Sequence, residues 1–302
     1  MMQYQFKPKS KLKEFLGDKL IASMAFVTCA AIILILIFIF KEAVPIFTSS
    51  EIQKEASVDK MLFKQNFVPD QPPKWSWQPN SDEPKYSLLP LVLGTIKAAL
   101  IAMLVAVPLG VGAAIYSAEF ASKRLREVLK PAIEMLAGIP SVVLGFFALM
   151  VIASYLQSSF DLIFRLNAVN AGIALGIAII PIIFTVAEDA MTAVPQSLRD
   201  AAIALGANPW QVSFTMVLPA AMPGIAAGIV LGFGRAIGET MIVLMASGNA
   251  AIISGNLTDS VRTMSATIAA ELGEVVFDSA HYNVLFFIGS LLFVFTFAVN
   301  FV

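Results

Sequence analysis

The chain contains 302 residues, of which 58% are hydrophobic and 14% are charged, and its formal net charge is −1. A soluble protein carries about 25% charged residues, so this composition indicates a protein surrounded by lipid, and no basic block points to a nucleic-acid partner. One cysteine, Cys29, and one histidine, His281, exclude an internal disulfide and a zinc site built on several such residues.

Six segments are apolar over the length of about 20 residues that a helix needs to cross a bilayer. They cover residues 20–40, 88–116, 133–155, 168–186, 223–246 and 282–302. The sequence therefore predicts an all-α membrane protein with six transmembrane helices. The first segment has no cleavage site after it, which favours a spanning helix over a signal peptide. The sixth is apolar to its last residue, so we expect the natural chain to continue past Val302.

Positive charges predict the orientation, because Lys and Arg gather on the cytoplasmic side of a membrane. The cations are Lys7, Lys9, Lys11, Lys13 and Lys19 in the tail 1–19, and Lys123, Arg124, Arg126 and Lys130 after the second span. If all six segments cross, both groups lie inside, together with both termini and the loop 188–221. Residues 41–87, 157–167 and 248–281 then lie outside.

The outer segment 41–87 is rich in proline, with Trp75 and Trp77 between the prolines at 69, 72, 73, 79 and 84. This pattern predicts an extended loop whose tryptophans anchor at the membrane interface, with a docking surface for an external partner as the alternative. Residues 260–274 predict an amphipathic surface helix, and we expect His281 to be an interface residue.

Arg235 falls near the middle of the fifth segment, and Glu239 follows four residues later on the same helix face. A charge at this depth is costly and usually faces a bundle interior or a water-filled path. The two residues predict either a structural ion pair or a site where Arg235 offers its donors to an oxyanion while Glu239 holds it in place. Thr240 and Ser247 follow as neutral donors. Glu188/Asp189 and Glu119/Arg124 are expected to be solvated pairs at the inner rim.

The stretch 200–219 is moderately polar but lies between two apolar segments. Asp200 opens a helix that Gly206 interrupts, and a second amphipathic run leads to Pro219. This pattern predicts two short helices joined at a glycine on the membrane face, a shape suited to docking into another protein. Because the chain has no P-loop, we expect neither ATP binding by that route nor enzymatic activity, and no cofactor.

The same stretch resembles the EAA loop of the ABC importer permeases, whose pattern is EAA-x3-G-x9-I-x-LP. The matching residues are Asp200, Ala201, Ala202, Gly206, Met216, Leu218 and Pro219, with Asp in place of Glu and Met in place of Ile. The run from Gly234-Arg235 to Gly238-Glu239-Thr240-Met241 is similar to the phosphate importer permeases. Gly248-Asn249 and residues 265–274 favour their PstC-like subunit over the PstA-like one.

This resemblance implies a type I ABC importer permease in the bacterial inner membrane, with a core over residues 88–302. Its implied partners are a second, PstA-like permease, a dimer of PstB-like ATPase subunits that hydrolyse the ATP, a periplasmic phosphate-binding protein, inorganic phosphate and membrane lipid. The implied substrate path contains Arg235, Glu239 and Thr240. The implied ATPase-coupling residues are Asp200, Ala201, Ala202, Gly206, Ala207, Asn208, Pro209, Trp210, Leu218 and Pro219.

Three alternatives to a phosphate permease remain open at this point. One is a permease for another oxyanion such as sulfate, molybdate or phosphonate, because no residue identifies the proton that distinguishes phosphate from sulfate. Another is a regulatory membrane scaffold that does not transport. A third is an autonomous channel or secondary carrier, which the docking loop argues against.

Overall fold

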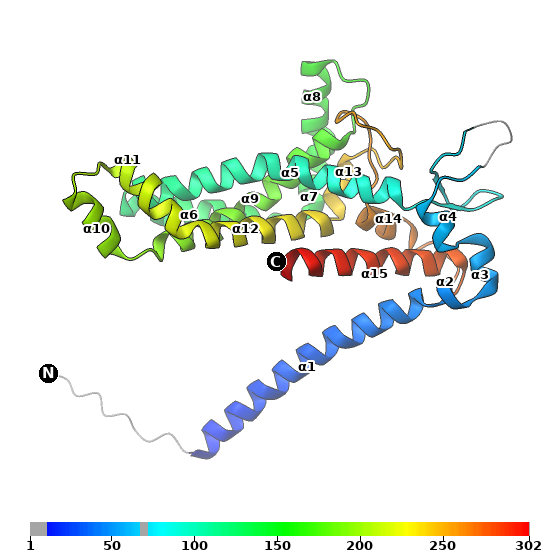
Figure 1. The fold of residues 1–302 in the computed structure, drawn as a ribbon, viewed down its shortest axis with the longest axis horizontal. Helices are drawn as coiled ribbons and strands as arrows, with labels where there is room; N and C mark the ends of the chain where they lie inside the picture. Colours follow the sequence, from blue (N-terminus) through cyan, green and yellow to red (C-terminus); the bar gives the residue numbers. More distant parts are fainter. Residues whose placement is uncertain (1–10, 67–71, 302) are drawn as a thin grey trace.

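The computed structural model describes residues 11–66 and 72–301, and these residues are predominantly helical (Figure 1). Lys7, Lys9, Pro69 and Val302, which entered the sequence expectations, lie outside the described residues. Within that part of the chain, six helical segments are long and apolar enough to cross a membrane. They are Gly17–Thr48, Leu89–Phe120, Ser141–Phe160, Ala168–Thr192, Pro209–Gly238 and Ala280–Phe301.

The first half of the chain ends at the loop after the third span. It contains the long helices α1 and α5, with shorter elements between and after them. Its elements are α1 (Lys11–Ala43), α2 (Pro45–Thr48), α3 (Ser50–Glu55), α4 (Val58–Leu62), β1 (Trp77–Gln78), β2 (Lys85–Tyr86), α5 (Leu89–Ile115), the π-helical turn η1 (Tyr116–Phe120), α6 (Lys123–Ala137), α7 (Ser141–Phe147), the π-helical turn η2 (Ala148–Ile152) and α8 (Ala153–Phe160).

The second half contains the central helix of the bundle and the last two spans. Its elements are α9 (Ala168–Thr192), α10 (Gln196–Ala204), α11 (Pro209–Gln211), the π-helical turn η3 (Val212–Val217), α12 (Leu218–Gly238), α13 (Met241–Ala246), α14 (Met264–Glu271) and α15 (Ala280–Phe301).

Helix α9 is the centre of the bundle and packs against α5, α12, α6 and α13. Of its most apolar stretch, 61% is buried inside the chain, compared with 39% for the span that contains α5. Small residues let the neighbouring backbones approach closely. A Cβ added at Gly176 would lie 3.0 Å from the Ala102 carbonyl oxygen of α5, and one at Gly232 of α12 would lie 2.9 Å from Ile179.

Helix α1 stands apart from this bundle and diverges from it along its length (Figure 1). None of its most apolar stretch is buried inside the chain. Its contacts are with α15 and α2, and they include an edge-on packing of Phe38 against Phe286 with ring centroids 5.6 Å apart. The first span is therefore attached mainly through the outer end of the last one.

The third span begins later than the sequence predicts. Instead of one helix over 133–155, the chain breaks at Gly138–Pro140 and the span begins at Ser141. Pro140 is extended, with ψ at 137°, and it has no N–H that could donate to the preceding helix. The residues before the break form the separate amphipathic helix α6, which packs against α9.

The outer segment 41–87 is more regular than the expected extended loop. It contains α2, α3, α4 and a short antiparallel hairpin in which Trp77 pairs with Tyr86. The described prolines after the gap stay outside helices, as expected. Trp77 is only 6% exposed, so the prediction that it anchors at the interface is wrong: its ring packs in the outer core with Tyr86.

The expected surface helix over 260–274 is also different in the structure. Helix α14 begins after Thr263, whose Oγ1 accepts from the Ala266 N–H at 3.3 Å, and it ends at Glu271. Its first turn, Met264 to Thr267, is buried. The helix lies between α5, α13 and α15 rather than on the surface, because its small residues fit between those helices.

Candidate functional site

The fifth span is broken where the sequence predicts a continuous helix over 223–246. Helix α12 ends at Gly238, Glu239 is extended with φ −67° and ψ 131°, and α13 begins at Met241. Side chains bind the backbone groups that the break exposes. The Thr240 N–H donates to Glu239 Oε1 at 3.2 Å, and Thr240 Oγ1 donates to the Gly238 carbonyl at 3.3 Å. Within a membrane, such non-helical backbone occurs only inside protein or beside water.

Arg235 lies in the last turn of α12, where the negative end of the helix dipole favours a cation. The expected ion pair with Glu239 does not form, because the helix ends before Glu239 and the carboxylate turns back to the Thr240 N–H. Among the described residues, none forms a hydrogen bond or an ion pair with the Arg235 side chain. Its donors are therefore available to another molecule.

Arg235 belongs to the exposed stripe of α12, the face of the helix that the rest of the chain leaves uncovered. The stripe consists of Pro219, Met222, Pro223, Ala226, Ala227, Leu231, Arg235 and Gly238. The opposite face, with Gly228, Gly232 and Ala236, is buried. An arginine facing hydrocarbon costs roughly 2.5–3.5 kcal/mol, so the exposed stripe is expected to face protein or water. Ser247, the other expected donor, is fully buried.

At the opposite end of α12, the stretch 200–219 forms the two short helices that the sequence predicts. Helix α10 ends near Gly206, which has φ at +88°, a conformation that side chains rarely adopt. Asn208 then caps α11 and forms reciprocal hydrogen bonds with Gln211, both of 2.9 Å. The turn and the second helix are thus fixed by local chemistry.

These two helices project from one end of the molecule and carry exposed apolar side chains (Figure 1). Leu205 is 90% exposed and Trp210 is 62% exposed. Trp210 stacks on Phe214, with ring centroids 5.3 Å apart and planes 6° apart, and it also contacts Phe120. The remaining coupling candidates occupy the same end. Asp200, Ala201, Asn208, Pro209 and Pro219 are exposed, Ala207 and Leu218 are half-buried, and Ala202 is buried.

Arg199 anchors α10 to the ends of two spanning helices. Its guanidinium donates to Glu119 Oε1 at 2.8 Å in η1, and to the carbonyls of Met191 and Val194 at 2.9 and 2.5 Å. The Glu119 side chain is only 8% exposed. The expected solvated pair with Arg124 is therefore wrong, because Glu119 points toward α10 instead.

Glu188 was also expected to be solvated, but its side chain is fully buried. Arg126 and Lys130 of α6 form ion pairs with it, and Lys130 also reaches Asp189 at 2.7 Å. These contacts attach α6 to α9 beside the anchored end of α10. Two separate sets of ion pairs therefore hold together the end of the bundle that carries α10 and α11. One joins α10 to η1, and the other joins α6 to α9.

At the end of the molecule opposite α10 and α11, three donors converge on Glu271. Trp77 Nε1 donates at 3.0 Å, His281 Nε2 lies 2.9 Å away, and Arg262 forms an ion pair. Burial would raise the pKa of Glu271, but the hydrogen bonds from His281 and Trp77 and the charge of Arg262 lower the pKa overall. His281 is thus part of a buried cluster rather than an interface residue. Burial and the charges of Glu55 and Glu271 raise the pKa of nearby Tyr86 to about 12.

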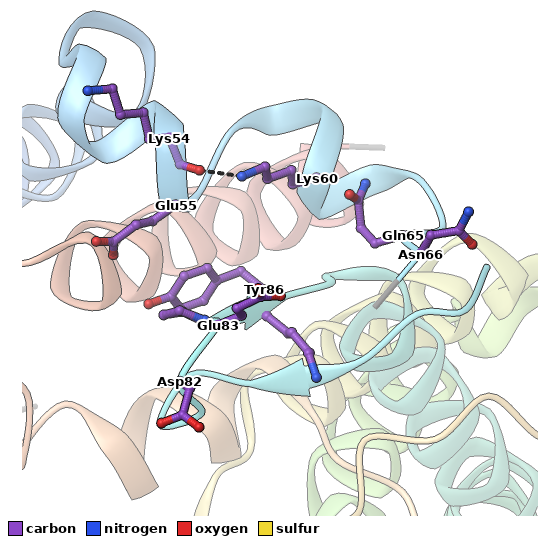
Figure 2. A pocket seen from close by; sticks show the side chains of 10 residues that line it. Lys54, Glu55, Lys60, Gln65, Asn66, Asp82, Glu83 and Tyr86 are labelled. Carbon is purple, nitrogen blue, oxygen red and sulfur yellow. Dashed lines mark hydrogen bonds between the residues drawn. The ribbon is translucent and has the colours of Figure 1, made fainter. Parts of the chain in front are cut away.

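A cavity of about 370 Å³ lies between α3, α4 and the hairpin (Figure 2). Its charged lining consists of Lys54, Lys60, Lys85, Glu55, Asp82 and Glu83. Figure 2 shows the Lys60 amine beside the Lys54 carbonyl and the Lys54 amine pointing away from Tyr86. Three carboxylates balance the three lysines of the lining, so this cavity has no excess of positive charge that would favour an anion. No metal-binding group of three His, Cys, Asp or Glu residues occurs in the described part of the chain.

Comparison with known proteins gives consistent matches. The family described as "Binding-protein-dependent transport system inner membrane component" matches residues 106–302. The probable ABC transporter permease protein YqgH of Bacillus subtilis is 36% identical over 74% of this chain and 72% of its own length. The phosphate transport system permease protein PstC of Mesorhizobium japonicum is 38% identical over 74% of this chain and 73% of its own.

Among solved structures, a chain of a bacterial alginate ABC transporter, in complex with an alginate-bound periplasmic protein, covers 97% of this chain and 95% of its own length. The TM-score is 0.59 at 17% sequence identity. This likeness concerns the fold alone, and it establishes the architecture of an ABC importer permease.

Proposed function

The chain belongs to the binding-protein-dependent transport system inner membrane components, and from this premise we propose that it is the membrane subunit of an ATP-driven phosphate importer. It is a multi-pass protein of the bacterial inner membrane, with six spans and the ABC importer permease fold. The phosphate assignment draws on relatives named as phosphate permeases, which are 32–38% identical to this chain.

Arg235 is the observation that carries the proposal. It is a guanidinium without a partner among the described residues, on the exposed stripe of α12 and next to a break in the same span. A planar fork of donors suits the oxygens of a tetrahedral anion, and its charge lowers the cost of bringing that anion into the membrane. Glu239 and Thr240 lie at the break itself, where the carboxylate disfavours prolonged retention of an anion near it.

A second permease, of the PstA-like kind, covers the exposed stripe of α12 in this proposal. The two chains enclose the path, so that Arg235 faces the substrate rather than lipid. This arrangement removes the cost of an arginine in hydrocarbon, which is why the stripe supports a heterodimer. A periplasmic phosphate-binding protein delivers the anion to the outer face.

The helices α10 and α11 dock into a PstB-like ATPase dimer on the cytoplasmic side, where both termini also lie. Leu205 and Trp210 supply the exposed apolar contact surface. Because Arg199 ties α10 to η1 and to the end of α9, a movement of the docked helices is transmitted to the two most closely packed spans. ATP hydrolysis by the separate ATPase chains thereby drives the exchange between outward-open and inward-open states.

Uptake of radiolabelled phosphate into vesicles that contain the full assembly tests the proposal. We expect ATP-dependent uptake that unlabelled phosphate and arsenate inhibit and that sulfate does not. Inhibition by sulfate with little effect of phosphate would make the chain a permease for a different oxyanion. An assembly that binds the ATPase but takes up neither anion would instead favour the regulatory scaffold.

A further inference from the structure

Helix α14 connects two features of the molecule that are far apart in the sequence. It lies between α5, α13 and α15, close to the break in the fifth span (Figure 1). Its first turn is buried, and its last residue is Glu271. Its first turn contacts the break and α5, whereas its last residue contacts β1 and α15.

The first turn of α14 binds the break directly. Ser265 Oγ donates to the carbonyl of Glu239 at 2.8 Å, and Ser265 is 4% exposed. That carbonyl has left the helical hydrogen-bond pattern, because Glu239 is extended. The first turn is itself held to α5, since the Met264 N–H donates to Thr95 Oγ1 at 3.0 Å. The backbone at Glu239 is thus fixed to α5 through the first turn of α14.

The last turn of α14 is tied to the outer hairpin and to α15. Glu271 accepts from Trp77 of β1 at 3.0 Å and contacts His281 of α15 at 2.9 Å. Glu271 is 14% exposed, so these contacts are made with little water present. Hydrogen bonds to a charged group are stronger than those between neutral groups. A displacement of the hairpin therefore carries the outer end of α14 with it.

We propose that Ser265 is a positioning residue for transport: it holds the Glu239 backbone in the extended conformation that ends α12 and leaves the Arg235 side chain without a partner among the described residues. Helix α14 then links the outer hairpin to the substrate path, with Glu271 at one end and Ser265 at the other. This inference rests on the proposed function, since it concerns the same path. The residues that form the link, Ser265 and Glu271, are not part of the proposed substrate path itself.

The test compares Ser265→Ala with Thr267→Val in the full assembly, reconstituted with its ATPase and phosphate-binding protein. Thr267 is a matched control, because it is fully buried in the same helix and its hydroxyl donates only to the Thr263 carbonyl of that helix. Removing a hydrogen bond of ordinary strength changes an equilibrium by roughly two- to tenfold. We expect Ser265→Ala to lower the maximal rate of phosphate uptake by a factor of that size, with the half-saturating concentration of the loaded binding protein unchanged.

The control variant should retain the wild-type rate, and Ser265→Thr, which keeps a hydroxyl, should recover most of it. A wild-type rate in Ser265→Ala, or an equal loss in Thr267→Val, would overturn the inference. So would failure of Ser265→Ala alone to assemble with its partners, because the hydroxyl would then be needed only for folding.

The outer link is tested with a second matched pair, Trp77→Phe and Trp75→Phe. The Trp75 indole donates to the Leu62 carbonyl within the outer segment, whereas that of Trp77 reaches Glu271. Only Trp77→Phe should lower the maximal rate, and equal rates in both variants would disprove the link. Phosphate uptake by the wild-type assembly tests the proposed function separately. Uptake there, with identical rates in all variants, overturns this inference and leaves the proposed function standing.

Discussion

In the proposed substrate path, the positive charge comes from a single guanidinium. Arg235 has no partner among the described residues, and its neighbour Glu239 caps the backbone at Thr240 instead. Arginine at this position therefore contributes little to the internal packing of the chain. Its removal should therefore lower phosphate uptake more than it lowers the stability of the fold.

We expect Arg235→Gln to abolish phosphate uptake while the complex still assembles. Arg235→Lys keeps the charge but loses the planar fork of donors, so it should retain a small part of the activity. Uptake of radiolabelled phosphate and co-purification of the partner subunits measure the two properties. Lys123→Gln, which removes an exposed cation outside the path, is the control. Normal uptake in Arg235→Gln would disprove the role of this residue.

Glu271 makes the attachment of the outer hairpin depend on pH. Because its pKa in the folded protein is lowered from 4.5, the stabilisation is complete above that value and is lost as the pH falls through the lower folded pKa. The groups that face it are Arg262, His281 and Tyr86. Trp77 fluorescence, recorded in a chain carrying Trp75→Phe and Trp210→Phe, should report detachment in that acid range. The same chain with Glu271→Gln should show no such transition, and an unchanged transition would contradict the assignment.

At the scale of elements, the connection between α10 and α11 depends on one backbone conformation. Gly206 has φ at +88°, and a Cβ placed there would meet nothing within 4 Å. The cost of a side chain is therefore conformational strain rather than a clash. Because the cost is one of backbone conformation, valine and asparagine at position 206 should have different effects.

Gly206→Val should cost roughly 1–2 kcal/mol at the turn and tilt α11 away from α10, because a β-branched residue does not adopt left-handed backbone readily. Gly206→Asn should behave nearly as the wild type, since asparagine tolerates that conformation. The measurement is stimulation of the ATPase by the loaded binding protein in the full assembly. Equal stimulation in the valine and wild-type assemblies would mean that the geometry of this turn does not matter for docking.

The sequence predicts the elements better than it predicts their breaks. Hydropathy locates the spans, and the spacing around Gly206 identifies the two short helices, because both signals are local. The break at Glu239 has apolar residues on either side, so periodicity gives no sign of it. Glu271 and Trp77 are 194 positions apart, and their contact exists only in the folded chain. The same holds for Arg199 of α10 and Glu119 of η1, which are 80 positions apart.

On the scale of the whole molecule, the proposed second permease would cover the exposed stripe of α12. Leu231 lies on this stripe and is 48% exposed, beside the uncovered Arg235. Leu34 of α1 is 64% exposed, but α15 lies between α1 and α12 (Figure 1). Both positions are therefore accessible in the isolated chain, but the proposed second permease would cover only Leu231.

A photo-crosslinker attached through Leu231→Cys should capture the second permease, whereas one attached through Leu34→Cys should not. Both variants are made in a Cys29→Ser background, which removes the single native thiol. Cross-linked products are separated by mass and identified with antibodies against each subunit. Capture of the second permease from Leu34→Cys alone would place the interface on the other side of the molecule.

The isolation of α1 also has an evolutionary consequence. Within the chain, a helix with none of its most apolar stretch buried is held mainly by its contacts with α15, such as that of Phe38 with Phe286. A substitution along the exposed stretch disturbs few neighbours in the chain, so this segment can drift in sequence at little cost to the internal packing. Helix α9 has no such freedom, because a change of volume at most of its positions disturbs several neighbours at once. We therefore expect the sequence of the first span to vary more among relatives than that of α9.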